Sequence, residues 1–254
     1  MKRIARAFLD SIFPPKCLVC GSLEGMRFPE GSGWAGARGS LSTASLCRRC
    51  EAELVAIDSP LCPRCGIPFV SGEGPDHHCL ECLTETRYFR KARSFGVYGG
   101  VLMKAIHVFK YGRKTVVSRR LGQLVRDSFH RHWKPDEVDL LLAVPLHRKR
   151  LRERGFNQAH LLITRWAKAQ EMAFDDALLT RHRMTEPQAG LSLHTRKGNV
   201  KGAFIVQKPE SVKGRRILLV DDVYTTGATV NECAKSLMKA RAEYVDVLTL
   251  ARAL

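Results

Sequence analysis

The sequence predicts an α/β protein with a mainly parallel sheet flanked by helices, preceded by a small cysteine-rich domain. From residue 88 onward, apolar runs alternate with amphipathic segments, which is the pattern of strands joined by helices. Eight of the nine cysteines lie before residue 83, in a region rich in glycine and serine. The surplus of positively charged residues lies in the part of the chain after these cysteines. We therefore expect two domains, residues 1–86 and 87–254.

Composition excludes several other classes of protein. Hydrophobic residues are 44% and charged residues 26% of the 254 residues, which excludes general disorder and collagen-like structure. No apolar run approaches the ~18 residues of a transmembrane helix. Segment 1–15 is basic but has no cleavage site, so we expect an amphipathic helix packed on the next domain, in preference to a membrane-surface anchor. The expected location is the cytoplasm.

The eight N-terminal cysteines form four CxxC pairs, and in a reducing compartment such pairs favour metal over disulfides. Two residues between thiolates let both sulfurs bind one tetrahedral ion, and zinc is the expected ion. A thioredoxin-like role is disfavoured because no βαβ pattern surrounds the pairs, and His77 and His78 are expected to face solvent. The spacing favours two successive ribbons over an interleaved cross-brace, which stays an alternative. The expected ribbons are Cys17, Cys20, Cys47 and Cys50, then Cys62, Cys65, Cys79 and Cys82.

These metals are expected to be structural, since the ribbon region has too few apolar residues to fold on a core alone. Each ion with four thiolates also adds a charge of about −2. Residues 1–86 already hold 9 Lys and Arg against 10 Asp and Glu, whereas residues 87–254 hold 33 against 15. We therefore expect an anionic partner to bind the C-terminal domain.

In that domain the apolar pattern predicts strands and helices in alternation. The expected strands are 92–98, 138–144, 178–181, 203–207, 216–220 and 245–251. The expected helices are 101–111, 117–132, 157–170 and 229–240. Cys233, on the last helix, is expected to face the core. Ligands of such a sheet bind at the carboxyl ends of its strands.

One segment, Arg215–Val230, carries the sharpest motif and reads RRILLVDDVYTTGATV. Ile217–Val220 is a continuous apolar run, typical of a central buried strand, and Asp221 and Asp222 stand at its carboxyl end. Residues 225–229 then form a small, hydroxyl-rich turn that opens a helix. The glycine permits close backbone approach, and the free amides with the helix dipole favour a phosphate.

This motif resembles the fingerprint of the type I phosphoribosyltransferases, in which an apolar strand and two acidic residues precede a TTGxT turn. The resemblance implies that Asp221 and Asp222 are the catalytic pair and hydrogen-bond the ribose hydroxyls of phosphoribosyl pyrophosphate, with Mg²⁺ on the ligand oxygens. Tyr224 departs from the small aliphatic residue usual in the family, which weakens any expectation of ordinary catalysis. The resemblance assigns the 5′-phosphate to Thr225, Thr226, Gly227, Ala228 and Thr229.

Two further segments, 144–160 and 181–204, narrow the resemblance. Taken with the four CxxC pairs and the terminal motif, in this order, they are similar to the ComF family, competence-protein-F-like proteins in which a double zinc ribbon precedes a phosphoribosyltransferase domain. We expect a basic loop from Pro145 to Arg154 and a mobile lid over 181–199. The expected pyrophosphate loop is Pro145, Leu146, His147 and Arg148. The expected polar groups of the lid are Arg183, Gln188, Arg196 and Asn199.

Residues 109–114, FKYGRK, interleave aromatic rings with cations, as contact with single-stranded DNA requires. Lys110, Arg113 and Lys114 are the expected nucleic-acid contacts, while Phe109 is either a stacking residue or part of the core. The family resemblance implies a role in DNA uptake during transformation, with uptake-machinery proteins as possible partners. We therefore expect a protein that binds phosphoribosyl pyrophosphate and single-stranded DNA. The alternative is an active phosphoribosyltransferase on an unidentified small acceptor.

Overall fold

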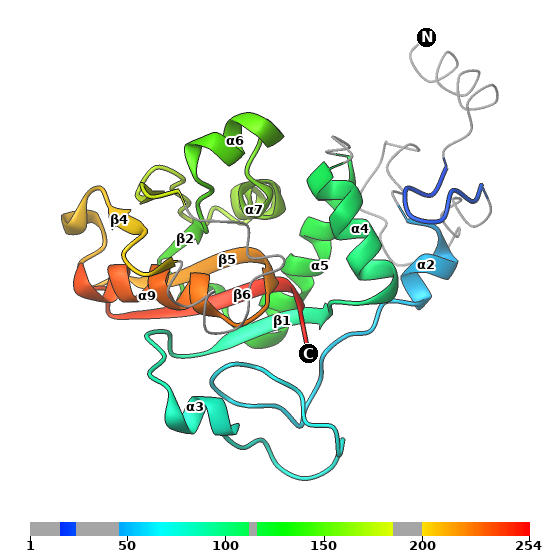
Figure 1. Ribbon diagram of the computed structural model, residues 1–254, viewed down its shortest axis with the longest axis horizontal. Helices are drawn as coiled ribbons and strands as arrows, with labels where there is room; N and C mark the ends of the chain where they lie inside the picture. Colours follow the sequence, from blue (N-terminus) through cyan, green and yellow to red (C-terminus); the bar gives the residue numbers. More distant parts are fainter. Residues whose placement is uncertain (1–15, 24–45, 112–115, 185–199) are drawn as a thin grey trace.

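A computed structural model describes residues 16–23, 46–111, 116–184 and 200–254 (Figure 1). Its centre is a four-stranded sheet in the order β1-β6-β5-β2, and each neighbouring pair of strands is parallel. All the carboxyl ends therefore meet at one edge. The strands are β1 (Ala92–Val97), β2 (Leu140–Ala143), β5 (Arg216–Tyr224) and β6 (Tyr244–Arg252).

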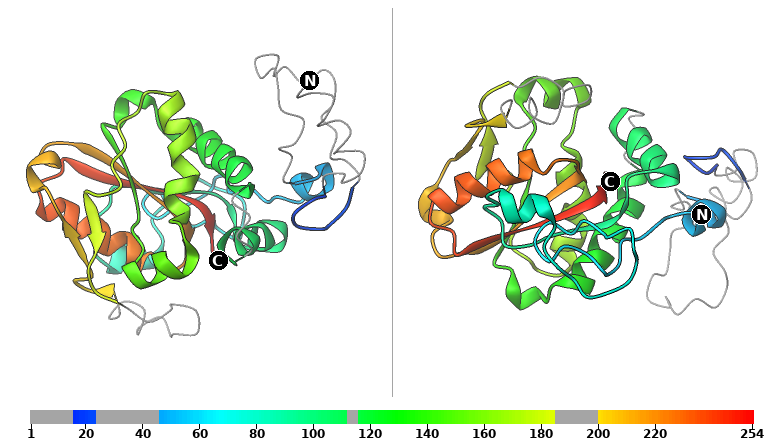
Figure 2. Two further views of the ribbon diagram at one scale, coloured as in Figure 1. Left: turned by 90° about the horizontal axis from the view of Figure 1, so that it is seen from above. Right: turned by 60° about the horizontal axis from the view of Figure 1, so that its bottom comes forward.

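Helices cover both faces of this sheet (Figures 1 and 2). Leu218 and Val220 of β5 pack toward one group of helices, whereas Ile217 and Leu219 pack toward the opposite face, and all four side chains are fully buried. Burial on both faces explains the continuous apolar run of this strand. The first face is covered by α4 (Gly100–Tyr111), α5 (Val117–His132) and α7 (Gln158–Ala169), and the second by α9 (Ala228–Lys239).

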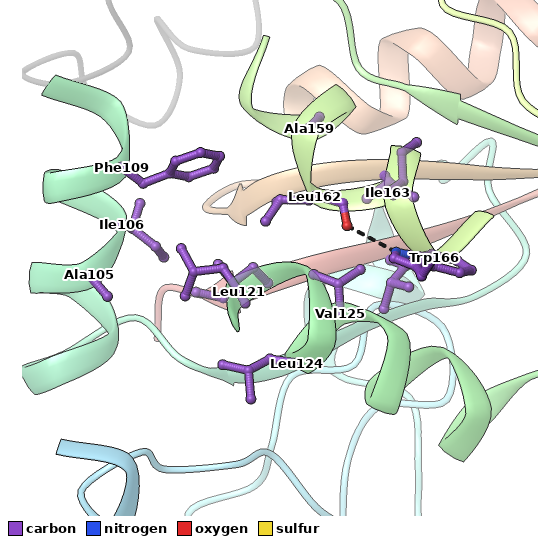
Figure 3. Close-up of a cluster of buried hydrophobic side chains, with 14 of the residues drawn as sticks. Ala105, Ile106, Phe109, Leu121, Leu124, Val125, Ala159, Leu162, Ile163 and Trp166 are labelled. Atoms are coloured by element: carbon purple, nitrogen blue, oxygen red, sulfur yellow. Dashed lines mark hydrogen bonds between the residues drawn. The ribbon is translucent and has the colours of Figure 1, made fainter. Parts of the chain in front are cut away.

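Figure 3 shows the apolar cluster where α4, α5 and α7 meet. Phe109 is fully buried there, which makes it a core residue and excludes it as a stacking surface. Gly122 lets α5 approach α7, because a Cβ at this position would lie 2.8 Å from the Leu162 carbonyl oxygen. On the other face, the thiol of Cys233 is fully buried, as predicted.

Smaller elements complete the fold. An antiparallel pair of strands lies beside the main sheet, and among the described residues two 3₁₀ turns and three short helices fill the connections. These are β3 (Leu179–Arg181), β4 (Phe204–Val206), η1 (Pro135–Glu137), η2 (Pro209–Ser211), α2 (Arg48–Ala52), α3 (Leu80–Thr84) and α6 (Arg148–Arg154). No helix in the described ranges is long and apolar enough to span a bilayer.

The predicted order of strands and helices in the C-terminal domain is confirmed, with two differences. β5 continues past the predicted end at Val220 to Tyr224, because its last residues pair with β6. The basic loop expected up to Arg154 is wrong, since most of it forms α6. The segment RKRLRER consists of good helix formers, the His147 side chain accepts from the Lys149 amide at 3.3 Å, and Gly155 ends the helix at φ 80°.

The outer edges of the sheet are covered. Beside β1, the Ile57 amide donates to the Phe95 carbonyl at 3.0 Å and the Val97 amide to the Val55 carbonyl at 2.9 Å. Gly96 allows this approach, because a Cβ there would overlap the Val55 carbonyl. On the opposite edge, β2 bridges residues 173–175 through Leu141.

The segment that joins the cysteine-rich region to the sheet is fixed to α9. The Asn231 side chain accepts from the Tyr88 amide at 2.8 Å and donates to the Thr86 carbonyl at 3.2 Å. The predicted domain boundary between residues 86 and 87 falls in this segment, and stays a prediction.

Candidate functional site

Asp221 and Asp222 are adjacent residues in the C-terminal half of β5, toward the carboxyl edge of the sheet. The Asp222 carboxylate accepts from the Lys110 ammonium on α4 at 2.9 Å. The Asp221 carboxylate accepts from the Asp222 amide at 2.8 Å. Desolvation, followed by the charge of Asp222, raises the pKa of Asp221 to about 7. The pair therefore offers acceptors for hydroxyl groups, one neutralised by a lysine and one that titrates near neutral pH.

Lys110 is the first site residue whose surroundings differ from the sequence-based expectation. Its side chain is 18% exposed and is engaged by Asp222. Desolvation lowers the pKa of Lys110 and the charge of Asp222 raises it, with a net rise. The sequence carried no signal for this pair, because its members are 112 residues apart. Its ammonium lies in the aspartate site, so any nucleic-acid role of Lys110 stays a prediction.

The turn after β5 forms a cradle for an anion. Gly227 adopts φ 73° at the N-cap of α9, a conformation that favours glycine. A Cβ there would also overlap the phenol of Tyr224 beneath the turn. The Thr226 hydroxyl accepts from the Ala228 amide at 3.3 Å. The first amides of a helix have no carbonyl partner within it, so this end of α9 offers free donors of the kind that suit an anion.

The predicted pyrophosphate loop lies at the same edge of the sheet. Pro145, Leu146 and His147 follow β2, whose Ala143 is in register with Val220 of β5. The Val144 amide donates to the Val220 carbonyl at 2.9 Å, and the Asn157 side chain donates back to the Val144 carbonyl at 3.1 Å. Arg148 begins α6. The strand pairing thus brings this basic segment beside the aspartates.

A further arginine near the aspartates was not predicted from the sequence. Arg181, in β3, has its guanidinium 5.5 Å from the Phe204 ring centre, and its charge acts to lower the pKa of Asp221. Arg183, predicted for the lid, donates to the Lys201 carbonyl at 2.6 Å. The other predicted lid residues, Gln188, Arg196 and Asn199, lie outside the described residues, as do the nucleic-acid candidates Arg113 and Lys114. Segment 1–15 also lies outside them.

The eight cysteines form two separate tetrads. The four sulfurs of each lie within 4.8 Å of one another, in the sequential grouping predicted, and no cross-brace is formed. The first tetrad is Cys17, Cys20, Cys47 and Cys50, and the second is Cys62, Cys65, Cys79 and Cys82. His77 and His78 are exposed and belong to neither.

Sulfur spacing in the tetrads fits zinc. Ligands at ~2.3 Å from a tetrahedral ion stand about 3.8 Å apart. Sulfur to sulfur distances are 3.8 Å for Cys17 and Cys50 and 3.6 Å for Cys65 and Cys79. Desolvation raises the pKa of Cys17, but backbone donors led by Cys20 outweigh it and bring that pKa to about 6. The same balance brings the pKa of Cys62 to about 7. One cysteine of each tetrad thus favours the thiolate, the form that binds metal, whereas desolvation raises the pKa of others, such as Cys65 to about 11.

Comparison with known families agrees with both halves of this description. Residues 8–83 match the double zinc ribbon domain, and residues 168–254 match the phosphoribosyl transferase domain. Fold and sites together define a class of protein in which paired zinc ribbons precede a phosphoribosyltransferase fold.

Curated relatives identify the family within this class. The DNA utilization protein YhgH of Escherichia coli K12 is 34% identical over 224 residues, which cover 86% of this chain and 93% of the relative. Competence protein F of Haemophilus influenzae is 33% identical over 226 residues, 85% of this chain and 95% of the relative. Competence protein ComFC of Bacillus subtilis is 26% identical over 93% of this chain and 94% of the relative. The chain belongs to this ComF family.

Among solved structures, an allosteric regulatory enzyme of purine biosynthesis matches with a TM-score of 0.34 and 18% identity, over 54% of this chain and 25% of that one.

Proposed function

We propose that this ComF-family protein binds phosphoribosyl pyrophosphate with Mg²⁺ at the edge of its sheet and handles single-stranded DNA during uptake. One observation carries the first part. The pairing of β2 with β5 gathers the two aspartates, the glycine turn and the basic loop at the same edge. The aspartates can accept hydrogen bonds from hydroxyls, and the turn and the loop can each receive phosphate groups. The proposed ligand carries ribose hydroxyls, a 5′-phosphate and a pyrophosphate, which match these three parts.

Each part of the ligand has a matching group in the site. Asp221 and Asp222 accept from the ribose hydroxyls, and the turn 225–229 receives the 5′-phosphate. The loop 145–148 receives the pyrophosphate. Carboxylate oxygens suit Mg²⁺. When bound, the ion would neutralise the pyrophosphate leaving group.

Calorimetry tests this binding. The zinc-loaded chain is titrated with phosphoribosyl pyrophosphate and Mg²⁺, and Asp222→Asn is expected to lose most of the affinity because it removes a charged acceptor. Asp127→Asn is the matched control, since Asp127 is a half-exposed acid on α5 that contacts Arg126. Absence of heat with the unaltered chain would refute the proposal.

A row of side chains along α4 supports the second part, the binding of single-stranded DNA. The Tyr98 hydroxyl and the His107 imidazole are 3.0 Å apart, and the rings of His107 and Tyr111 are 5.9 Å apart. Tyr111 is 68% exposed, with the Arg154 guanidinium 5.4 Å from its ring centre. Exposed rings interleaved with cations are what unpaired bases stack on. Lys110 precedes Tyr111, so the row borders the aspartate site.

Fluorescence anisotropy with a labelled single-stranded oligonucleotide tests the row. Binding should weaken steeply as salt rises. Tyr111→Ala should lose about 1–3 kcal/mol of binding free energy, the usual value for one stacked base. Tyr88→Ala is the control, because Tyr88 is also exposed but contacts α9. No binding at low salt would remove DNA from the proposal. Partners in the uptake machinery and a cytoplasmic location belong to the same proposal.

An active transferase on a small acceptor is the second candidate, and the pKa of Asp221 favours it. A carboxylate that titrates near pH 7 can accept a proton from an acceptor at neutral pH. Pyrophosphate release should then require both Mg²⁺ and an acceptor, and should rise as the pH passes about 7. Release that is insensitive to Asp221→Asn would count against this role.

A further inference from the structure

Tyr224 lies between the turn 225–229, which we call the phosphate turn, and the second tetrad. Its side chain is 2% exposed, and it forms the floor under Gly227, where a Cβ would overlap the phenol. The ring meets Phe89 edge-on at 6.4 Å between centres. Its hydroxyl interacts with the Arg252 side chain and is the Tyr224 atom nearest to the Cβ position of Gly227. The phenol, ring and hydroxyl together, therefore supports the turn, which explains why a large aromatic stands where the resemblance led us to expect a small aliphatic residue.

Arg252 connects this ring to a cysteine of the second tetrad. It is the last residue of β6, in register with Tyr224, and is 2% exposed. Its guanidinium lies 4.3 Å from the Tyr224 ring centre. It also donates to the Cys65 carbonyl at 2.6 Å and contacts the Cys65 sulfur at 3.6 Å. One buried cation thus touches both the floor of the turn and a metal ligand.

A second buried arginine approaches the same tetrad. The Arg87 side chain is 2% exposed, lies 2.7 Å from the Glu81 carboxylate, and interacts with Cys82. Four thiolates around a divalent ion carry a net charge of about −2, which the two guanidiniums offset. The ion holds the four sulfurs together, and without it the Cys65 carbonyl and sulfur that Arg252 contacts are no longer fixed in place. The position of Arg252, and with it the Tyr224 ring, therefore depends on the metal.

We propose that metal binding at the second tetrad and phosphate binding at the turn are coupled through Arg252 and Tyr224. Each ligand raises the affinity for the other, because both favour the same position of the guanidinium and ring. Such coupling is reciprocal. The inference rests on the proposed function, in that the turn must bind a phosphate. Tyr224 and Arg252 act as positioning residues.

Alkylation of cysteines in the full, zinc-loaded chain tests the coupling. N-ethylmaleimide modifies a thiol when its zinc bond opens, and mass spectrometry reads each cysteine separately. With saturating phosphoribosyl pyrophosphate and Mg²⁺, modification of the second tetrad should slow about fivefold or more, a usual size for coupling between sites. The first tetrad should be unchanged and serves as the internal control.

Three variants locate the coupling in the Tyr224 ring and its contact with Arg252. Tyr224→Phe keeps the ring against which the Arg252 guanidinium lies, and should keep most of the protection. Tyr224→Ala should abolish the protection and weaken ligand binding while zinc content stays at two ions per chain. Arg252→Lys keeps the charge but not the fork that reaches both partners, and should also lose the protection. Retained protection in Tyr224→Ala would overturn the role of the ring.

The unaltered chain tests the coupling even if a variant fails to fold. Calorimetric binding of the ligand without slower modification of the second tetrad would overturn the coupling and leave the proposed function intact. Equal slowing of both tetrads would also overturn it, since that reports general stabilisation. No calorimetric binding would overturn the proposed function and the coupling with it.

Discussion

The two tetrads have the same ligand chemistry but different surroundings. Cysteines of the first pack with the helices α4 and α5, and its helix α2 is tied to the body by the Arg120 to Glu51 ion pair at 2.6 Å, which is partly exposed. The second packs against the sheet beside two buried arginines and the floor of the phosphate turn. The first tetrad thus attaches a segment to the body of the protein, whereas the second, under the coupling proposed above, supports the turn 225–229.

Removal of one cysteine ligand from each tetrad should have the largest effect on stability and should distinguish the two tetrads by phosphate binding. Structural zinc contributes ~10–16 kcal/mol of apparent binding free energy, so each loss is large. Cys65→Ser should lower the melting temperature of the whole chain and abolish phosphate binding. Cys20→Ser should release zinc while leaving phosphate binding in place. Scanning calorimetry with zinc analysis measures this, and loss of phosphate binding in both would contradict the distinction.

Replacement of Arg252 should have the next largest effect. Arg252→Met leaves the Cys65 carbonyl unpaired and the thiolates short of a counter-charge, and removing one partner of such a buried pair costs about 3–5 kcal/mol. Urea unfolding measures the loss. A loss below about 1 kcal/mol, the usual value for an exposed pair, would show that the cation is dispensable.

Gly227→Ala tests the contact between the turn and Tyr224. The variant combines a positive φ with overlap of the Tyr224 ring, and a cost of about 1–3 kcal/mol is expected, with weaker phosphate binding. Gly214→Ala is the matched control, because Gly214 has φ 69° and open space around its Cβ position. Equal effects of the two variants on phosphate binding would show that the ring does not limit the turn.

The smallest effect is expected on the side of the first tetrad. Arg120→Met removes the contact with Glu51, a partly exposed ion pair of the kind worth about 0–1 kcal/mol. Phosphate binding should be unchanged. A loss of phosphate affinity in calorimetry would mean that the first tetrad also reaches the site.

Local patterns predicted much of this structure. The four CxxC pairs fixed the ligands, and the apolar run before Asp221 fixed the central strand, because both signals lie within a few residues of sequence. Lys110 and Asp222 are separated by 112 positions in the sequence, and Cys65 and Arg252 by 187. Such contacts depend on the packed fold, so no local sequence pattern could predict them. The helix α6 was missed because its charges were interpreted as loop contacts instead of helix formers.

The segment that runs along β1 has a consequence for how the chain can be divided. Residues 55–57 occupy the hydrogen-bonding groups of an outermost strand, and they lie between the two tetrads in sequence. A shortened protein that begins at residue 87 would present a bare strand edge, which is a template for pairing with another molecule. Residues 55–57 thus cover the edge through which neighbouring copies of the sheet would otherwise be able to pair.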